Sequence, residues 1–218
     1  MFSTPTRPEI DHRTIKLIVG VIAISLASLT SCFATTAIGS ISASYYEGGW
    51  SQAIFIGFLF AIAAFLLAYN GRSRPQMLWS KVAATAALGV ALFPCRCKSH
   101  VELVPYVHAF SAATMFSILA FFCYTFFERA RGKGHLQANA RAAIYAVCGI
   151  AIVLAILVLA IDSVSGGPLS ARIPRLTFYG EGTALVAFGI SWLTASRVLP
   201  IITRRDERFS PLAAEVPE

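Results

Sequence analysis

Residues that could ligate a metal or react as thiols gather around position 100 of this 218-residue chain. Cys95, Cys97, His100 and Glu102 lie within eight positions, and His108 follows. Thiolate, imidazole and carboxylate groups are the usual zinc ligands. The usual structural zinc pattern of two separated Cys pairs, or of paired Cys with paired His, is absent. Cys95, Cys97 and His100 are therefore candidate ligands only, and no metal or other cofactor is predicted.

The same thiols also suit disulfide formation. Cysteines that lie close together in an oxidising compartment tend to pair. Cys95 could pair with Cys97 in a small ring, or one of the two could pair with Cys32. Free thiols and a redox site remain open alternatives.

Glu181 is the residue that the sequence singles out most clearly. It lies between Gly180 and Gly182 inside a long apolar run. A carboxylate at membrane depth costs a few kcal/mol unless it is paired, protonated or wetted. We therefore expect Glu181 to face other helices, either in a functional role or as a structural hydrogen-bond partner.

Polar residues also follow the first apolar run, where Ser42, Ser44, Tyr45 and Glu47 precede Gly48-Gly49. This pattern is typical either of a helix end followed by a flexible turn or of the polar rim of a cavity. No Gly-x-Ser-x-Gly elbow is present, so nothing marks a serine nucleophile.

Asp162, Arg172 and Arg175 lie close together before the last apolar run. They could form an ion pair between Asp162 and Arg175, or an anion-binding rim that holds a lipid headgroup. Ten polar residues lie near the same predicted membrane surface, judged by their positions along the predicted helices. We interpret them as candidate ligand-binding groups of one outward-opening cavity: Ser42, Ser44, Tyr45, Glu47, His108, Asp162, Arg172, Arg175, Tyr179 and Glu181.

The elements that carry these residues are apolar helices. Hydrophobic residues make up 56% of the chain and charged residues 13%, against about 25% charged in a soluble domain. A spanning helix needs about 20 apolar residues. Six stretches fit this length: Ile15–Ala37, Ser51–Tyr69, Trp79–Pro94, Tyr106–Phe127, Arg141–Ile161 and Leu176–Ser196. The third has a short apolar core, so a re-entrant segment is an alternative there.

Basic residues alternate between the connecting segments. Fourteen of the 18 Lys and Arg residues lie in the two terminal segments and in the second and fourth connections. The positive-inside rule then places both termini in the cytoplasm. The prediction is an all-α, six-transmembrane-helix bundle of the inner membrane over residues 15–197. Residues 1–14 form a cytoplasmic segment, and residues 198–218 a cytoplasmic tail that is disordered beyond Arg208.

Two stretches carry a resemblance to a known family. The segment Ser40-Ile41-Ser42 with the tyrosines after it and Ile54-Phe55-Ile56-Gly57, and the segment from Glu181 to Leu193, resemble small bacterial membrane proteins of the DUF998 type. These are distantly similar to the Frag1/DRAM/Sfk1 family, whose eukaryotic members are linked to lipid remodelling. The resemblance covers residues 38–195 and implies six helices.

The function expected from these features is non-enzymatic binding of a lipid or small amphiphile in an outward-facing cavity. Accessory packing in a larger membrane complex is the first alternative, and an intramembrane lipid hydrolase or a small transporter the next. Membrane lipids, and possible membrane subunits, are the expected partners. Nucleic acid is not, because the basic residues sit in short loops beside apolar spans.

Overall fold

The computed structural model describes residues 11–97, 100 and 104–210, and this part of the chain contains helices and no strand. Glu102 and the first ten residues lie outside it, as does the tail from 211. The elements are α1 (His12–Cys32), the 3-10 turn η1 (Ser42–Tyr46), α2 (Gly49–Ala68), α3 (Arg74–Leu92), α4 (Val107–Arg131), α5 (Leu136–Val164), α6 (Pro168–Arg172), α7 (Leu176–Ser196) and η2 (Arg205–Glu207). The chain is therefore all-α, as predicted.

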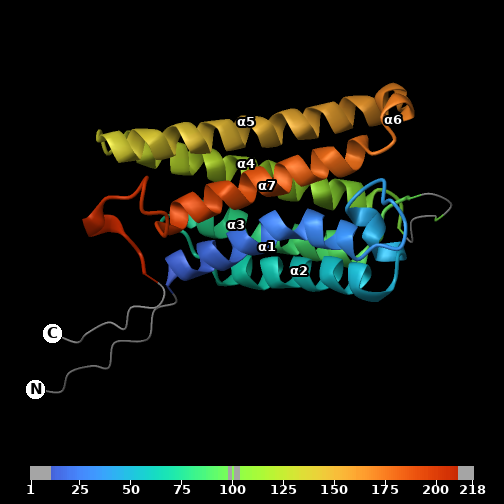
Figure 1. The fold of residues 1–218 in the computed structure, drawn as a ribbon, viewed down its shortest axis with the longest axis horizontal. Helices are drawn as coiled ribbons and strands as arrows, with labels where there is room; N and C mark the ends of the chain where they lie inside the picture. Colours follow the sequence, from blue (N-terminus) through green and yellow to red (C-terminus); the bar gives the residue numbers. More distant parts are fainter. Residues whose placement is uncertain (1–10, 98–99, 101–103, 211–218) are drawn as a thin grey trace, which may run out of the picture.

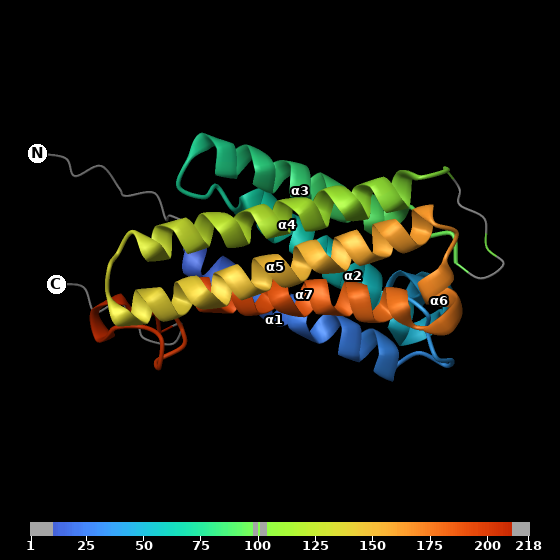
Figure 2. The same cartoon turned by 90° about the horizontal axis from the view of Figure 1, so that it is seen from above.

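The six long helices form one elongated bundle (Figures 1 and 2). Each packs against its neighbours in the sequence, and α1 packs against α7, so the helices close into a ring. Aromatic side chains fill the centre, with Trp192 of α7 and Phe122 of α4 fully buried. Tyr69, at the end of α2, packs against both rings.

Different connecting segments lie at the two ends of the bundle (Figure 1). The start of α1, the end of α7 and the α2–α3 and α4–α5 turns lie together at what we call the basic end, which carries Arg13, Arg72, Lys133 and Arg197. The segments 33–48 and 165–175 lie at the opposite end, which we call the cavity end.

Helices α1 and α7 approach each other closely at two glycines. A Cβ atom on Gly189 would lie 2.7 Å from the carbonyl oxygen of Gly20 and 2.5 Å from a side-chain carbon of Ile24. A Cβ on Gly20 would lie 3.0 Å from the carbonyl oxygen of Gly189. Small residues at such a crossing let two backbones pack directly, as in many membrane helix pairs.

Four helices are long and apolar enough to cross a membrane: α1, α2, α4 and α5. Helix α3 has 19 residues and α7 has 21, and neither is among these four. Helix α3 is one uninterrupted helix that begins at Arg74, five residues before the predicted Trp79. Pro75 explains the earlier start, because Pro is favoured in the first turn of a helix.

The first apolar run ends earlier than predicted. Helix α1 stops at Cys32, whereas the sequence predicted a span to Ala37. Glu47 accepts hydrogen bonds from the backbone amides and the hydroxyl groups of Thr35 and Thr36. These contacts turn the chain away from the helix axis and fold it back over the bundle.

Candidate functional site

A cavity of about 1270 Å³ opens at the cavity end. Helices α4, α5 and α7 line it together with the segments 37–43 and 95–97. Four of the ten candidate ligand-binding residues line it, namely Ser42, His108, Asp162 and Glu181, as do the candidate metal ligands Cys95 and Cys97. The sequence thus identified side chains that the fold brings to one cavity from four separate segments.

Glu181 enters this site from the first turns of α7. Its Oε2 atom accepts a hydrogen bond from the backbone amide of Ile41 at 2.6 Å and a longer one from the amide of Ser42 at 3.4 Å. Its Oε1 atom lies 3.0 Å from the hydroxyl oxygen of Ser42. The carboxyl group therefore holds the segment before α2 against the start of α7.

The flanking glycines explain how α7 fits there. A Cβ atom on Gly180 would lie 2.8 Å from a methyl carbon of Leu159 on α5. On the other side, a Cβ on Gly182 would just reach Ala27 and Ile41. Gly180 thus permits the close approach of α5, and Glu181 is left to turn toward Ser42.

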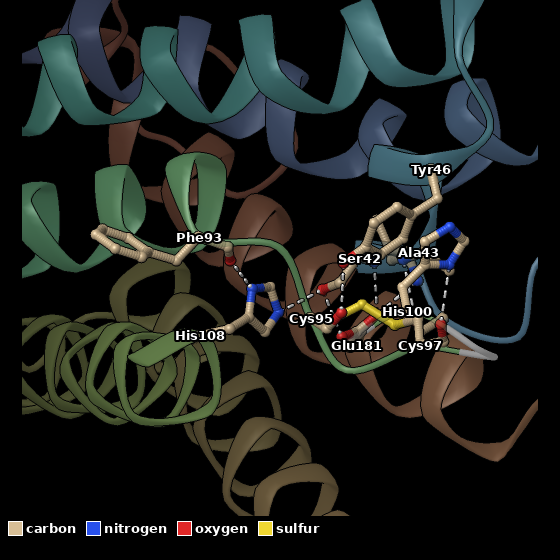
Figure 3. Close-up of a disulfide and its surroundings, with 11 residues drawn as sticks. Ser42, Ala43, Tyr46, Phe93, Cys95, Cys97, His100, His108 and Glu181 are labelled. Carbon is tan, nitrogen blue, oxygen red and sulfur yellow. Dashed lines mark hydrogen bonds between the residues drawn. A yellow bond between two sulfur atoms is a disulfide. The ribbon is translucent and has the colours of Figure 1, made fainter. Parts of the chain in front are cut away.

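His108 joins the same group from α4 (Figure 3). Its Nδ1 atom lies 2.7 Å from the carbonyl oxygen of Phe93, and its Nε2 atom lies 3.0 Å from the hydroxyl oxygen of Ser42. The side chain is 6% exposed. Ser42 therefore stands between the imidazole and the carboxyl group, and these three residues are called the His–Ser–Glu relay below.

A disulfide joins Cys95 and Cys97 beside the relay (Figure 3). Of the pairings that the sequence left open, this is the one in the structure, and Cys32 is a free, exposed thiol. The hydroxyl of Tyr46 donates to the carbonyl oxygen of Cys95 at 3.0 Å. The ring of His100 stacks on that of Tyr46 with centroids 3.9 Å apart. Both cysteines line the cavity, and the hydrogen bond from Tyr46 to Cys95 holds the stacked rings beside them.

No metal site emerges in the part of the chain that the structure describes. There, no group of three or more His, Cys, Asp or Glu side chains is placed to hold an ion. Cys95 and Cys97 are bonded to each other, which removes the thiolates that His100 would need as co-ligands.

The deeper walls of the cavity are apolar. Small side chains on α4 (Ala109, Ala112 and Ala113) face Ala155, Ile156, Leu159 and Ala160 on α5. Phe116 of α4 and Ala184 of α7 also contribute. The cavity thus combines a polar group at the relay with a hydrocarbon-like interior.

Asp162 lines the cavity, but its carboxylate binds the backbone of α6. Its carboxylate accepts hydrogen bonds from the backbone amides of Leu169 at 2.7 Å and Ser170 at 3.3 Å. Arg175 donates instead to the carbonyl oxygen of Ile38 and packs on the ring of Phe178. The ion pair considered between Asp162 and Arg175 is therefore not formed. Arg172 is exposed at the end of α6, away from the cavity lining.

Four other predicted residues also lie outside the cavity lining. Ser44 is fully buried within η1, and Tyr45 is half-buried against the ring of Tyr46. Tyr179 is 55% exposed on α7. Hydrogen bonds from the hydroxyl groups of Thr35 and Thr36 lower the pKa of Glu47 to about 2.

One charged cluster at the basic end was not predicted. Glu207 of the tail forms ion pairs with Lys133, with Arg141 at 3.0 Å and with Arg197 at 3.0 Å. Partial burial opposes ionisation of Glu207, but the hydrogen bond from Lys133 and the arginine charges outweigh it and lower the pKa to about 2. Arg141 is fully buried, so the first part of the tail is a packed segment.

Comparisons with protein-family models, with curated proteins and with solved structures each find no match to this chain.

Proposed function

We propose that this chain is an inner-membrane protein that crosses the bilayer with six helices and binds a lipid or small amphiphile in the cavity between α4, α5 and α7. Both termini are cytoplasmic in this proposal, so the cavity opens outward. The single observation that carries it is the lining of the cavity. A relay of His108, Ser42 and Glu181 borders an interior of alanine, leucine, isoleucine and phenylalanine side chains.

That lining suits an amphiphile for a physical reason. Ligand sites are mostly apolar with a few placed polar groups that fix orientation. An acyl or isoprenoid chain would bury apolar surface along α4 and α5, at roughly 25 cal/mol per Å². A headgroup would meet the hydrogen-bonding groups at the mouth.

Two alternatives have less support. A serine hydrolase needs backbone amides free to stabilise an oxyanion. Here the amides of Ile41 and Ser42 bind Glu181, and Ser42 stands between acid and base rather than at one end. An accessory subunit would bind its partner through the exposed apolar side chains of α5, such as Ile150 and Leu154. In a protein that crosses the bilayer, lipid also covers these side chains, so their exposure does not call for a partner.

The family resemblance of residues 38–195 to DUF998-type proteins remains a prediction. This resemblance and the proposed function have membrane lipids in common.

Native mass spectrometry of the protein released from nanodiscs tests the proposal. We expect a copurified lipid or amphiphile on the wild-type chain and its loss from Ala113→Phe, which places a ring in the cavity. Ala53→Phe on the exposed face of α2 is the matched control and should keep the ligand. Equal ligand content in both variants, or none in the wild type, would contradict the proposal. A companion polypeptide at fixed ratio would favour the accessory role.

A further inference from the structure

The hydrogen-bond geometry of the relay fixes one proton of His108. A carbonyl oxygen only accepts hydrogen bonds, so Nδ1, which lies 2.7 Å from that of Phe93, must carry hydrogen. Nε2 then carries hydrogen only when the imidazole is positively charged. The contact of Nε2 with Ser42 therefore depends on the charge of His108.

Ser42 has one hydroxyl proton and two neighbours at 3.0 Å, Nε2 of His108 and Oε1 of Glu181. If the imidazole is neutral and the carboxyl group ionised, both neighbours are acceptors and one hydroxyl proton cannot serve both. One additional proton removes this conflict in either of two ways. Charged His108 donates to Ser42, which donates to ionised Glu181, or protonated Glu181 donates to Ser42, which donates to neutral His108.

A second additional proton changes what Ser42 can do. With Glu181 protonated and His108 charged, both side chains donate to the Ser42 oxygen. The hydroxyl proton of Ser42 then has no acceptor within the relay. Because Ser42 lines the cavity, an acceptor bound there can take this hydrogen bond.

From this geometry we infer that the cavity takes an amphiphile with an anionic headgroup together with one proton, which the relay of His108, Ser42 and Glu181 accepts. The inference rests on the proposed amphiphile site and adds the charge of its ligand. When the ligand enters as a neutral acid, its O–H bond breaks and an N–H bond forms on His108 or an O–H bond on Glu181. When it enters as an anion, the buffer acid supplies the proton through the solvent and is left as its conjugate base. No electrons are transferred.

Other groups around the cavity fit this ligand. Arg96 lies at the exposed mouth and supplies a positive charge. The carboxylate of Asp162 is held by two amides of α6, and the Cys95–Cys97 disulfide does not titrate. Among the described residues, Tyr106 also lines the cavity, Tyr46 donates to the carbonyl oxygen of Cys95 and stacks on His100, and Arg175 donates to the carbonyl oxygen of Ile38.

Calorimetry of the nanodisc-embedded protein tests the inference with three probes of equal chain length. Decyl sulfonate keeps its charge at neutral pH, decanol is uncharged, and decyltrimethylammonium is cationic. Titrations in two buffers of different ionisation enthalpy count the protons taken up. We expect about one proton per decyl sulfonate bound and none for decanol. The cation should bind at least tenfold more weakly than the sulfonate.

Variants locate the proton. In the double variant Glu181→Gln with His108→Gln, sulfonate should bind without proton uptake, because neither group can gain a proton. Ser42→Ala removes the donor to the headgroup and should lower sulfonate affinity by about ten- to a hundredfold while leaving decanol binding nearly unchanged. Glu128→Gln, which changes an exposed carboxylate near the other end of α4 and outside the cavity lining, is the control and should behave as the wild type.

The outcomes separate the two proposals. Binding of sulfonate by the wild type without proton uptake would overturn this inference and leave the amphiphile site standing. So would unchanged uptake in the double variant, or equal affinity for all three probes. Absence of binding by every probe would overturn the amphiphile site and this inference with it. The wild-type titrations decide between these results even if a variant fails to fold.

Discussion

The Nδ1 atom of His108 lies 2.7 Å from the carbonyl oxygen of Phe93, so a side chain at the start of α4 holds the backbone at the end of α3. Replacement of His108 by Phe leaves that carbonyl and the hydroxyl of Ser42 without their bond to α4. We expect a loss of about 2–3 kcal/mol in the free energy of unfolding. His108→Gln should lose less, because its amide can still donate to the carbonyl. Unfolding in mixed micelles measures both variants, and equal losses would contradict the role of this bond.

The crossing of α1 and α7 predicts a strong effect of one methyl group. In Gly189→Ala the new carbon meets the backbone oxygen of Gly20 at 2.7 Å, so the helices must separate. We expect a loss of about 1–3 kcal/mol in the same unfolding assay. Gly57→Ala is the matched control, because nothing lies within 4 Å of the added carbon on α2. It should be neutral or stabilising by up to about 1 kcal/mol, and similar losses in both variants would refute the close crossing.

Glu47 predicts a defined dependence of stability on acid pH. Its pKa falls from the ordinary value of 4.5 to about 2 because the hydroxyls of Thr35 and Thr36 bind its ionised form. A lowered pKa means that the stabilisation is complete above pH 4.5 and disappears as pH falls toward 2. We expect this stabilisation to be about 1 kcal/mol at most, because solvent screens the charge of an exposed group. The difference in stability between wild type and Glu47→Gln should shrink over this range. A constant difference would show that Glu47 does not act through its charge.

The ion pairs of Glu207 should protect the tail from cleavage by a protease. In Glu207→Gln the contacts to Lys133, Arg141 and Arg197 lose their charge, and buried Arg141 loses its counter-ion. We expect trypsin to cleave after Arg204 and Arg205 several-fold faster than in the wild type, since cleavage follows the open population. Asp206→Asn alters the neighbouring acid, which has no ion pair among the described residues, and should leave the rate unchanged. Equal acceleration in both variants would contradict the role of Glu207.

The free cysteines predict a labelling pattern that tests the proposed topology. Cys32 is exposed at the cavity end of α1, whereas Cys123 and Cys148 are buried in the bundle. A membrane-impermeant maleimide added to intact cells should label the wild type at Cys32 and leave Cys32→Ser unlabelled. Labelling of Cys32 only after the inner membrane is opened would place the cavity end in the cytoplasm and reverse the proposed orientation.

Local patterns in the sequence predicted the helices well. The last helix spans Leu176–Ser196 in both the prediction and the structure, because a single apolar run with polar flanks defines it. At two of the boundaries that differ, a distant residue is the reason. Glu47 shortens α1 by binding Thr35 and Thr36, and Glu207 permits Arg141 to lie buried within α5, where the sequence indicated a span boundary.

The sequence predicted side chains of the site but not the backbone groups that these side chains bind. Burial of polar groups at membrane depth singled out Glu181, and depth alone grouped it with Ser42 and His108. The amide of Ile41 and the carbonyl of Phe93 carry no side-chain signal, yet they orient the carboxyl and the imidazole. The same depth argument also gathered Glu47 and Tyr179, because it cannot tell which way around a helix a residue points.

The bond between Glu181 and the amide of Ile41 joins residues 140 positions apart. During synthesis the segment 33–48 emerges long before α7 has been made, so the amide of Ile41 cannot bind the carboxyl group of Glu181 until that last helix is present. The cavity is therefore completed only when the last long helix is added, and a nascent chain that stalls before α7 lacks one of its walls.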